Sequence, residues 1–139
     1  MYHTILIPVD ISDKNEVPVK FITQWGTPTS TSVVLLHVIE TLKDIAFEDL
    51  EGFYQTLQHK AEQKMTILEE ELSAVGYQVE QKIVYGRRGK EILGYAEEEG
   101  VDLIVLRSHV MDRSNPGKGL GTLSHQVALL ASCSVWLIR

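Results

Sequence analysis

Glycines and charged or nucleophilic side chains are concentrated between Leu106 and Ser124, in the stretch LRSHVMDRSNPGKGLGTLS. Three of the ten glycines of the chain fall within Gly117–Gly121, and Lys118 lies among them. Glycine adopts positive φ readily and lets backbone amides approach a ligand closely. A glycine-rich loop between a strand and a helix N-terminus can therefore hold an anion. Such loops are also ordinary turns, so an anion site requires that other elements complete it.

Basic side chains surround this loop in a chain that is acidic overall. Arg107, Arg113 and Lys118 add positive charge there, whereas the formal net charge of the 139 residues is −6. An acidic balance argues against nonspecific nucleic-acid binding, which needs a basic face, but it permits one local basic pocket. Lys118 is equally compatible with a solvated loop. Arg107 follows a buried strand directly, and a charged residue at such a place usually faces a cleft or a partner.

Other reactive residue types occur without the spacing that chemistry needs. His109 and His125 form no HxH or HxxxH pattern, so we expect no metal site. Ser108 and His109 are adjacent, which disfavours a nucleophile–base pair, and no nucleophile-elbow pattern surrounds the serine. His37 lies inside an apolar strand and is predicted to be a hydrogen-bonded core histidine. Cys133, the only cysteine, is predicted to pack internally and excludes a disulfide framework. We therefore expect neither catalytic nor metal-ligating residues.

Predicted strands and helices alternate along the chain on both sides of this loop. Short apolar runs predict five strands, at Thr4–Val9, Val33–Val38, Tyr77–Val84, Leu103–Leu106 and Val135–Ile138. Apolar residues at helical spacing predict four helices, at Val17–Trp25, Phe53–Val75, Lys90–Glu99 and Leu120–Leu130. Gly76 and Gly100 are placed to end two of them, and Gly86–Gly89 is expected to be a turn. The pattern assigns no structure to Ile39–Gly52, which could fold over a cleft.

This alternation predicts an α/β protein. Parallel strands need crossover connections, which the helices supply, and the result is an open sheet with helices on both faces. Ligands bind such sheets at the carboxyl ends of strands, where the strand order reverses. Length predicts a single domain over residues 1–139. No leader sequence and no apolar run of roughly 20 residues is visible, so we expect a cytoplasmic protein without a membrane partner.

Four segments carry a resemblance to a known family. Ile5–Ser12, reading ILIPVDIS, resembles the opening strand of universal stress protein domains, and Leu35–Val38 resembles their second strand. Gly100–Val105, followed by Ser108 and His109, is similar to their fourth strand and its exit. The closing segment CSVWLI is similar to the final strand of the family. The resemblance covers essentially the whole chain in the same order.

The resemblance implies a fold and a ligand. The fold is a five-stranded parallel sheet of order 3-2-1-4-5, Rossmann-like and related to adenine-nucleotide alpha-hydrolases, with strands 1 and 4 at the reversal. The ligand is an adenine nucleotide, ATP or AMP, with Mg²⁺ only if ATP is bound. The implied binding residues are Pro8, Val9, Asp10, Val38, Arg107, Ser108, Gly117, Lys118, Gly119, Gly121, Thr122 and Leu123.

The phosphate motif of the nucleotide-binding branch is only partly present. That motif is Gly-x-x-Gly, nine residues, then Gly-Ser or Gly-Thr. Gly121 and Thr122 match its last pair, whereas Arg107 and Val110 stand at the first two glycines and the spacer has one extra residue. The site is therefore either rebuilt, with basic side chains and extra glycines, or lost.

Each implied role has a structural alternative. Asp10 would hold the ribose or an adenine edge, or it is a turn residue at a strand end. Val38 would offer backbone groups to adenine, or it packs in the core. Gly121 and Thr122 would present amides and a hydroxyl to phosphates, or they begin a helix.

Three hypotheses about function follow. The leading one is a stress-responsive universal stress protein that binds an adenine nucleotide as a ligand and is not an enzyme, beyond slow incidental hydrolysis. The second is a dimeric interaction protein with a degenerate pocket. The third is an enzyme acting on a small anion, with Arg107 and His109 in the cleft.

The final strand suggests a homodimer. Trp136 is expected to expose a large apolar group beside unpaired backbone, and edge strands of that kind tend to be covered. Members of the family commonly dimerise through this strand. The implied contact residues are Val135, Trp136, Leu137 and Ile138.

Overall fold

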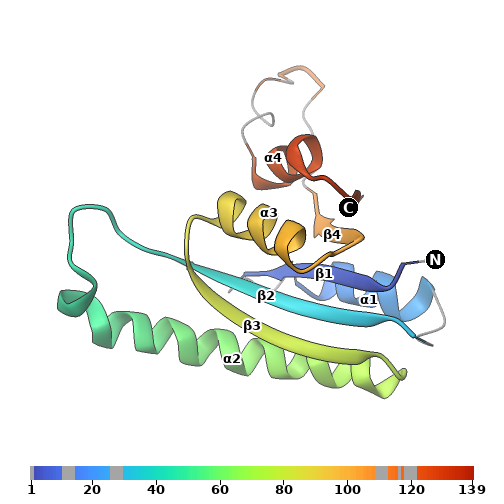
Figure 1. Ribbon diagram of the computed structural model, residues 1–139, viewed down its shortest axis with the longest axis horizontal. Helices are drawn as coiled ribbons and strands as arrows, with labels where there is room; N and C mark the ends of the chain where they lie inside the picture. Colours follow the sequence, from blue (N-terminus) through green and yellow to red (C-terminus); the bar gives the residue numbers. More distant parts are fainter. Residues whose placement is uncertain (1, 11–14, 26–29, 109–112, 116, 118–121) are drawn as a thin grey trace.

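Five parallel strands form one sheet of order β3-β2-β1-β4-β5 (Figure 1). The computed structural model describes residues 2–10, 15–25, 30–108, 113–115, 117 and 122–139. The strands are β1 (Thr4–Val9), β2 (Ser32–Glu40), β3 (Gln78–Gly86), β4 (Leu103–Arg107) and β5 (Ser134–Ile138). This order confirms the predicted topology, with β1 and β4 side by side at the reversal.

Helices cover both faces of the sheet, as predicted. They are α1 (Glu16–Trp25), α2 (Glu51–Ala74), α3 (Arg88–Glu98) and α4 (Leu123–Leu130), with a short 3-10 helix, η1 (Phe47–Leu50), before α2. In the part of the chain that the structure describes, none of these helices has the length and apolar character required to cross a bilayer.

Two apolar clusters lie on the two sides of the sheet because successive strand residues point to opposite faces. Ile5 and Ile7 of β1 pack with α1 and α2, in a cluster that includes Met65 and Leu72. Leu6 of β1 belongs to the other cluster, with residues of α3 and α4. A strand that is buried on both faces must be continuously apolar, which explains the unbroken runs in the sequence.

Glycines end two helices in the way that the sequence predicts. Gly76 follows α2 with φ 100°, and Gly100 follows α3 with φ 64°. Both values lie in the left-handed region, which residues with a Cβ rarely adopt. Because α2 stops at Ala74, Val75 leaves its apolar stripe and is 42% exposed, contrary to expectation.

The predicted turn at Gly86–Gly89 is wrong. Strand β3 continues to Gly86, because its pairing with β2 runs to the Glu40–Gly86 pair. Helix α3 then begins at Arg88, after Arg87 as its N-cap residue. The connection is therefore tighter than predicted, and it brings the first residue of α3 to the end of β2.

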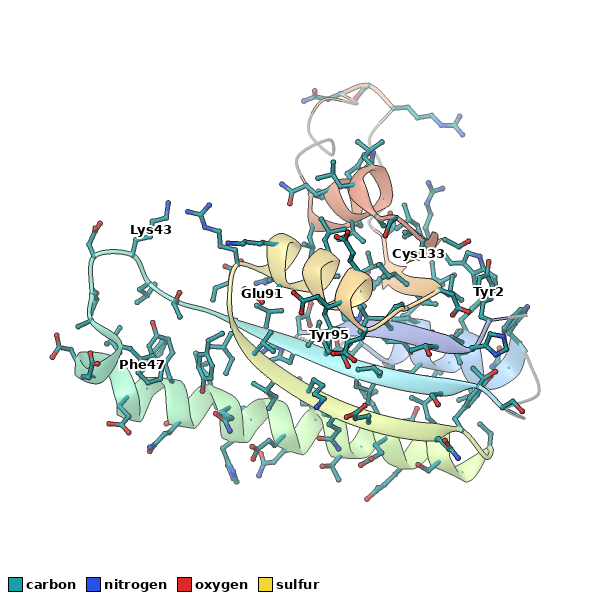
Figure 2. All side chains as sticks on the ribbon, viewed as in Figure 1. Tyr2, Lys43, Phe47, Glu91, Tyr95 and Cys133 are labelled. Carbon is teal, nitrogen blue, oxygen red and sulfur yellow. The ribbon has the colours of Figure 1, made fainter. Side chains whose placement is uncertain are left out.

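The stretch that the sequence left unassigned packs beside α2 and β3. The ring of Phe47, which Figure 2 labels, stacks on the ring of Tyr54 with the two centroids 5.0 Å apart, and it meets Tyr85 edge-on at 5.5 Å. The hydroxyl of Tyr54 accepts a hydrogen bond from the Leu42 amide at 2.9 Å. Aromatic contacts therefore hold this segment at one end of the molecule, beyond β2, as Figure 1 also shows.

The expectation that Trp136 is exposed is also wrong. Its ring packs among Tyr2, Phe21 and Trp25, with centroid distances of 5.4, 5.7 and 4.7 Å. Alternation along β5 turns Trp136 toward the α1 face, where these aromatic residues pack against it and leave it half-buried. Its neighbour Leu137 is the exposed apolar residue of the strand, at 38%.

Candidate functional site

A cavity of about 320 Å³ lies at the carboxyl ends of β1, β2 and β4. This size falls at the lower end of the range for small-molecule sites. Its position is the one where open parallel sheets bind ligands. The predicted residues that line it are Pro8, Val9, Asp10, Val38, Arg107, Thr122 and Leu123.

The other predicted site residues have different locations. Ser108 is buried but is not among the lining residues, and its amide continues the sheet by donating to the Ile138 carbonyl at 2.7 Å. Gly117 is exposed and is not a lining residue either. Lys118, Gly119 and Gly121 lie outside the described residues, so their predicted roles stay predictions.

The sequence reasoning missed half of the cavity wall. The additional lining residues are Asn15, Pro18, Leu36, Arg88, Ile92, Leu106 and Ser124. Most of them are apolar residues that had been assigned only to strands or helices. The sequence pattern predicts a turn at Arg88, which hides its role, and nothing near Asn15 in the sequence indicates a role for that residue.

Asn15 holds the backbone where β1 ends. Its Oδ1 accepts a hydrogen bond from the Asp10 amide at 2.8 Å, and its Nδ2 donates to the Asp10 carbonyl at 2.5 Å. The side-chain amide thus replaces a strand partner, as short polar side chains do in turns. Because the amide and the carbonyl of Asp10 are both held, the position of its Cα is fixed, and its side chain starts from a defined place in the cavity lining.

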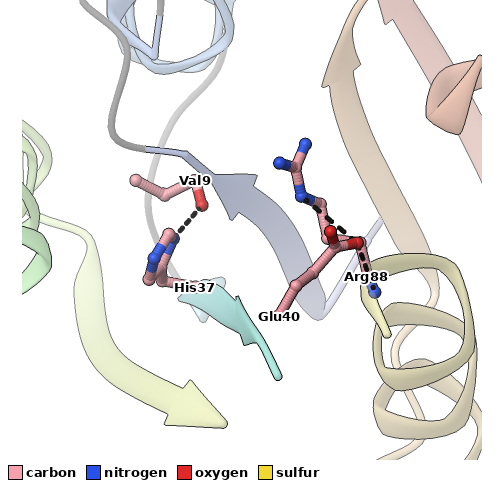
Figure 3. A network of polar contacts seen from close by, with 4 residues as sticks. All are labelled: Val9, His37, Glu40 and Arg88. Atoms are coloured by element: carbon pink, nitrogen blue, oxygen red, sulfur yellow. Dashed lines mark hydrogen bonds and ion pairs between the residues drawn. The ribbon is translucent and has the colours of Figure 1, made fainter. Parts of the chain in front are cut away.

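His37 fixes the residue before Asp10. It is buried, and its Nδ1 lies 2.7 Å from the Val9 carbonyl oxygen (Figure 3). Because a carbonyl can only accept, Nδ1 carries the proton in this contact. The prediction of a hydrogen-bonded core histidine is confirmed. Val9 and His37 are also the last paired residues of β1 and β2. The side-chain hydrogen bond therefore acts as a clamp that adds to the backbone pairing at the end of β1.

Charge in the cavity is positive, against the balance of the chain. The described lining residues include two cations, Arg88 and Arg107, and one anion, Asp10. Arg107 is the last residue of β4, is half-buried and lines the cavity. Because the whole chain carries −6, this concentration of arginine is a local feature that suits an anionic ligand.

Apolar and helical surfaces complete the cavity. Leu36, Val38, Ile92 and Leu106 all belong to the cluster beneath α3 and α4, and they form an apolar wall. Helix α4 begins at the cavity with Thr122 as its N-cap residue. The first amides of a helix lack internal partners and favour anions. The site thus combines an apolar wall with basic and helical groups.

A second, wide-open groove lies at the other end of the sheet. Its lining residues include Tyr2, Asp102 and Cys133. The Asp102 carboxylate accepts hydrogen bonds from the His3 and Thr4 amides at 2.8 and 2.9 Å, so it holds the start of β1. Partial burial raises the pKa of the Cys133 thiol. Across the described ranges, no cluster of three or more His, Cys, Asp or Glu residues could hold a metal ion.

Comparisons with known proteins agree with this architecture. The family model of the universal stress protein family matches residues 1–139. Universal stress protein MJ0577 of Methanocaldococcus jannaschii is 35% identical, over 78% of this chain and 78% of that protein. A solved structure of hypothetical protein MJ0577 superposes with a TM-score of 0.79 at 32% identity, covering 99% of this chain and 96% of the other.

More distant structures share the fold. A universal stress protein from Archaeoglobus fulgidus in complex with dAMP has a TM-score of 0.70 at 18% identity, covering 99% and 98% of the two chains. A universal stress protein in complex with cAMP has a TM-score of 0.69 at 18% identity, covering 99% and 97%. The family model spans the whole chain, and a relative that is 35% identical covers 78% of it, so this protein belongs to the universal stress protein family.

Proposed function

We propose that this protein is a stress-responsive member of its family that binds an adenine nucleotide, ATP or AMP, as a ligand in the β1/β4 cavity. The observation that carries the proposal is the cavity itself, where an apolar wall, Asp10, Arg107 and the start of α4 converge at the switch point of the sheet. The complexes of fold relatives with dAMP and cAMP support this ligand class.

Each part of a nucleotide has a chemically matched partner in this proposal. The flat, largely apolar face of adenine lies against Leu36 and Val38. The Asp10 carboxylate accepts hydrogen bonds from ribose hydroxyls. The phosphates lie toward Arg107 and Thr122, where a guanidinium fork and the helix N-terminus favour anions.

The nucleotide is proposed to act as a ligand, with turnover at most slow and incidental. Among the described lining residues, Asp10 is the one group with the chemistry of a general base, and the proposal assigns it to the ribose. Mg²⁺ would enter with ATP, held by the phosphates as is usual for this ion. Because adenine nucleotides are cytoplasmic metabolites, the proposal also places the protein in the cytoplasm.

Calorimetry on the nucleotide-stripped protein tests the proposal. ATP and AMP should bind in the micromolar range, and Asp10→Ala should weaken both by about tenfold, because the ribose loses a charged hydrogen-bond partner. Asp49→Ala is the matched control, since Asp49 is an exposed residue of η1 outside the cavity. Absence of heat from folded wild-type protein, or equal effects of the two variants, would overturn the proposal.

A second candidate function is association through the sheet edge. Strand β5 pairs with β4 and has the outer position in the sheet. Large apolar groups lie exposed on β5 and on the helix before it, with Leu137 at 38%, Leu129 at 77% and Leu130 at 69%. We propose that a second copy of this chain covers this edge, through the strand that holds Val135, Trp136, Leu137 and Ile138. In this dimer Leu137 would contact the second copy directly. Trp136 would contribute indirectly, because its packing inside the fold holds β5 in place.

A further inference from the structure

Two arginines reach the proposed nucleotide cavity from different elements. Arg107 ends β4, whereas Arg88 is the first residue of α3 and lines the cavity beside the end of β2. The position of Arg107 matches a glycine of the family's phosphate motif, so a side chain stands where backbone would be expected. Arg88 adds a second guanidinium that the motif does not include.

Glu40 holds Arg88 through one edge of its guanidinium. The Glu40 Oε1 atom lies 3.8 Å from Arg88 Nε and 3.5 Å from the Arg88 amide nitrogen. The two side chains are 49% and 56% exposed, for Arg88 and Glu40 respectively. Long distances and exposure to solvent make this a weak ion pair, of a kind that contributes little to stability. An anion that binds the same guanidinium therefore competes with only a weak ion pair.

The rest of the guanidinium is directed away from Glu40. Figure 3 shows Nε facing the carboxylate and the terminal nitrogens on the far side of the group. Among the described residues, Arg88 forms one ion pair, and its partner is Glu40. A guanidinium presents its donors in a rigid fork that matches two phosphate oxygens. The terminal nitrogens thus have the geometry to bind an anion.

We propose that Arg88 is a second phosphate-binding residue, which acts with Arg107 on the phosphate chain of the ligand while Glu40 competes for the same guanidinium. The inference rests on the proposed function for the adenosine half of the ligand. It assigns to arginine side chains the phosphate contacts for which the family motif uses glycine amides. The site then favours polyanionic nucleotides over uncharged nucleosides.

Because Glu40 competes with phosphate for Arg88, substitutions of the two residues should change the ATP affinity in opposite directions. Arg88→Gln removes charge-assisted hydrogen bonds, so the dissociation constant for ATP should rise about tenfold. Glu40→Gln removes the competitor but keeps the side-chain shape, so ATP should bind about twofold to fivefold more tightly. Adenosine has no phosphate, so its affinity should be the same in wild type and in both variants.

The experiment measures adenosine, AMP, ATP and inorganic tripolyphosphate by calorimetry without Mg²⁺. Arg87→Gln is the matched control, because Arg87 is the exposed neighbour with the same charge and is not a lining residue. It should change the ATP dissociation constant by less than about twofold, as expected for a screened surface charge. Circular dichroism and thermal unfolding establish that each variant is folded.

The outcomes separate this inference from the proposed function. If wild type binds nucleotides and Arg88→Gln binds ATP unchanged, or weakens adenosine equally, the inference is overturned and the proposed function stands. The same holds if Arg87→Gln has the effect of Arg88→Gln. If no adenine compound binds but tripolyphosphate binds in an Arg88-dependent way, the proposed function is overturned and the anion site stands. If nothing binds, both are overturned.

Discussion

The side-chain amide of Asn15 makes two hydrogen bonds to the backbone of Asp10, accepting from its amide at 2.8 Å and donating to its carbonyl at 2.5 Å. This relationship joins the start of α1 to the end of β1. It defines the position from which the Asp10 side chain meets the cavity, and it makes Asn15 a positioning residue for the proposed ligand.

Asn15→Ala should therefore lower both stability and affinity. The loss of the two hydrogen bonds should decrease the free energy of unfolding by about 1–2 kcal/mol. ATP affinity should fall about threefold to tenfold, because Asp10 loses its fixed backbone. Urea unfolding and calorimetry measure the two effects. Asn115→Ala, at an exposed position, is the control. A stable variant with wild-type affinity would show that Asp10 is held by other contacts.

His37→Phe should destabilise the end of β1. The substitution keeps an aromatic ring but removes the donor that satisfies the Val9 carbonyl, and a buried acceptor without a partner costs about 1–3 kcal/mol. Urea unfolding of the variant measures this cost. His59→Phe on the exposed surface of α2 is the control and should change the free energy of unfolding by less than about 0.5 kcal/mol. Equal losses in the free energy of unfolding for His37→Phe and His59→Phe would contradict a stabilising role for the hydrogen bond from His37 to the Val9 carbonyl.

Tyr77 should make stability fall at alkaline pH. Burial raises the pKa of its phenol above the ordinary value of 10.0, and its hydroxyl donates to the Ile22 carbonyl at 3.1 Å. The folded state therefore keeps the proton when the unfolded chain begins to lose it. The contribution to stability is complete below pH 10 and decreases as pH rises toward the folded-state pKa.

Tyr77→Phe tests this linkage. At pH 7 the variant should lose about 1 kcal/mol, because one hydrogen bond is absent. Between pH 9 and 11 its free energy of unfolding should fall less steeply than that of wild type, as measured by urea unfolding at several pH values. Tyr95, whose pKa burial also raises, keeps part of the slope in both proteins. Identical slopes would exclude Tyr77 as a source of the pH dependence.

Leu137→Arg should convert the proposed dimer to a monomer. Leu137 is exposed on the edge strand, so a charge there should oppose pairing between two copies without disturbing the core. Light scattering after size-exclusion chromatography gives the mass of each species. Ile67→Arg, at an exposed position of α2, is the control and should stay dimeric. A monomeric wild-type protein at micromolar concentration would refute the proposal.

Much of the fold could be predicted because its signals are local. Thr4–Val9 is continuously apolar since both faces of β1 are covered, and Gly76 and Gly100 end helices through their own φ values. The order of the strands came from the resemblance to a family, since periodicity alone does not say which strands are neighbours. Asp10 and Arg107 could be placed at the cavity because both follow apolar strands at the reversal.

Tertiary structure decided how Trp136, Asn15 and Arg88 are used. Trp136 is half-buried because α1 brings Phe21 and Trp25 to the same face of β5, across more than 100 residues of sequence. Arg88 reaches the cavity because β3 continues to Gly86 alongside Glu40, so that α3 begins beside the end of β2. Such contacts depend on sheet register and on the path of each crossover.

Local sequence patterns were thus enough to predict the alternation of strands and helices, the faces that are buried, and the polar residues at the strand ends. These properties follow from the spacing of apolar groups within a few residues. The charges that share the cavity and the apolar groups that stay exposed became apparent from the folded chain alone. Those outcomes depend on the packing of segments far apart in the chain, which no local pattern encodes.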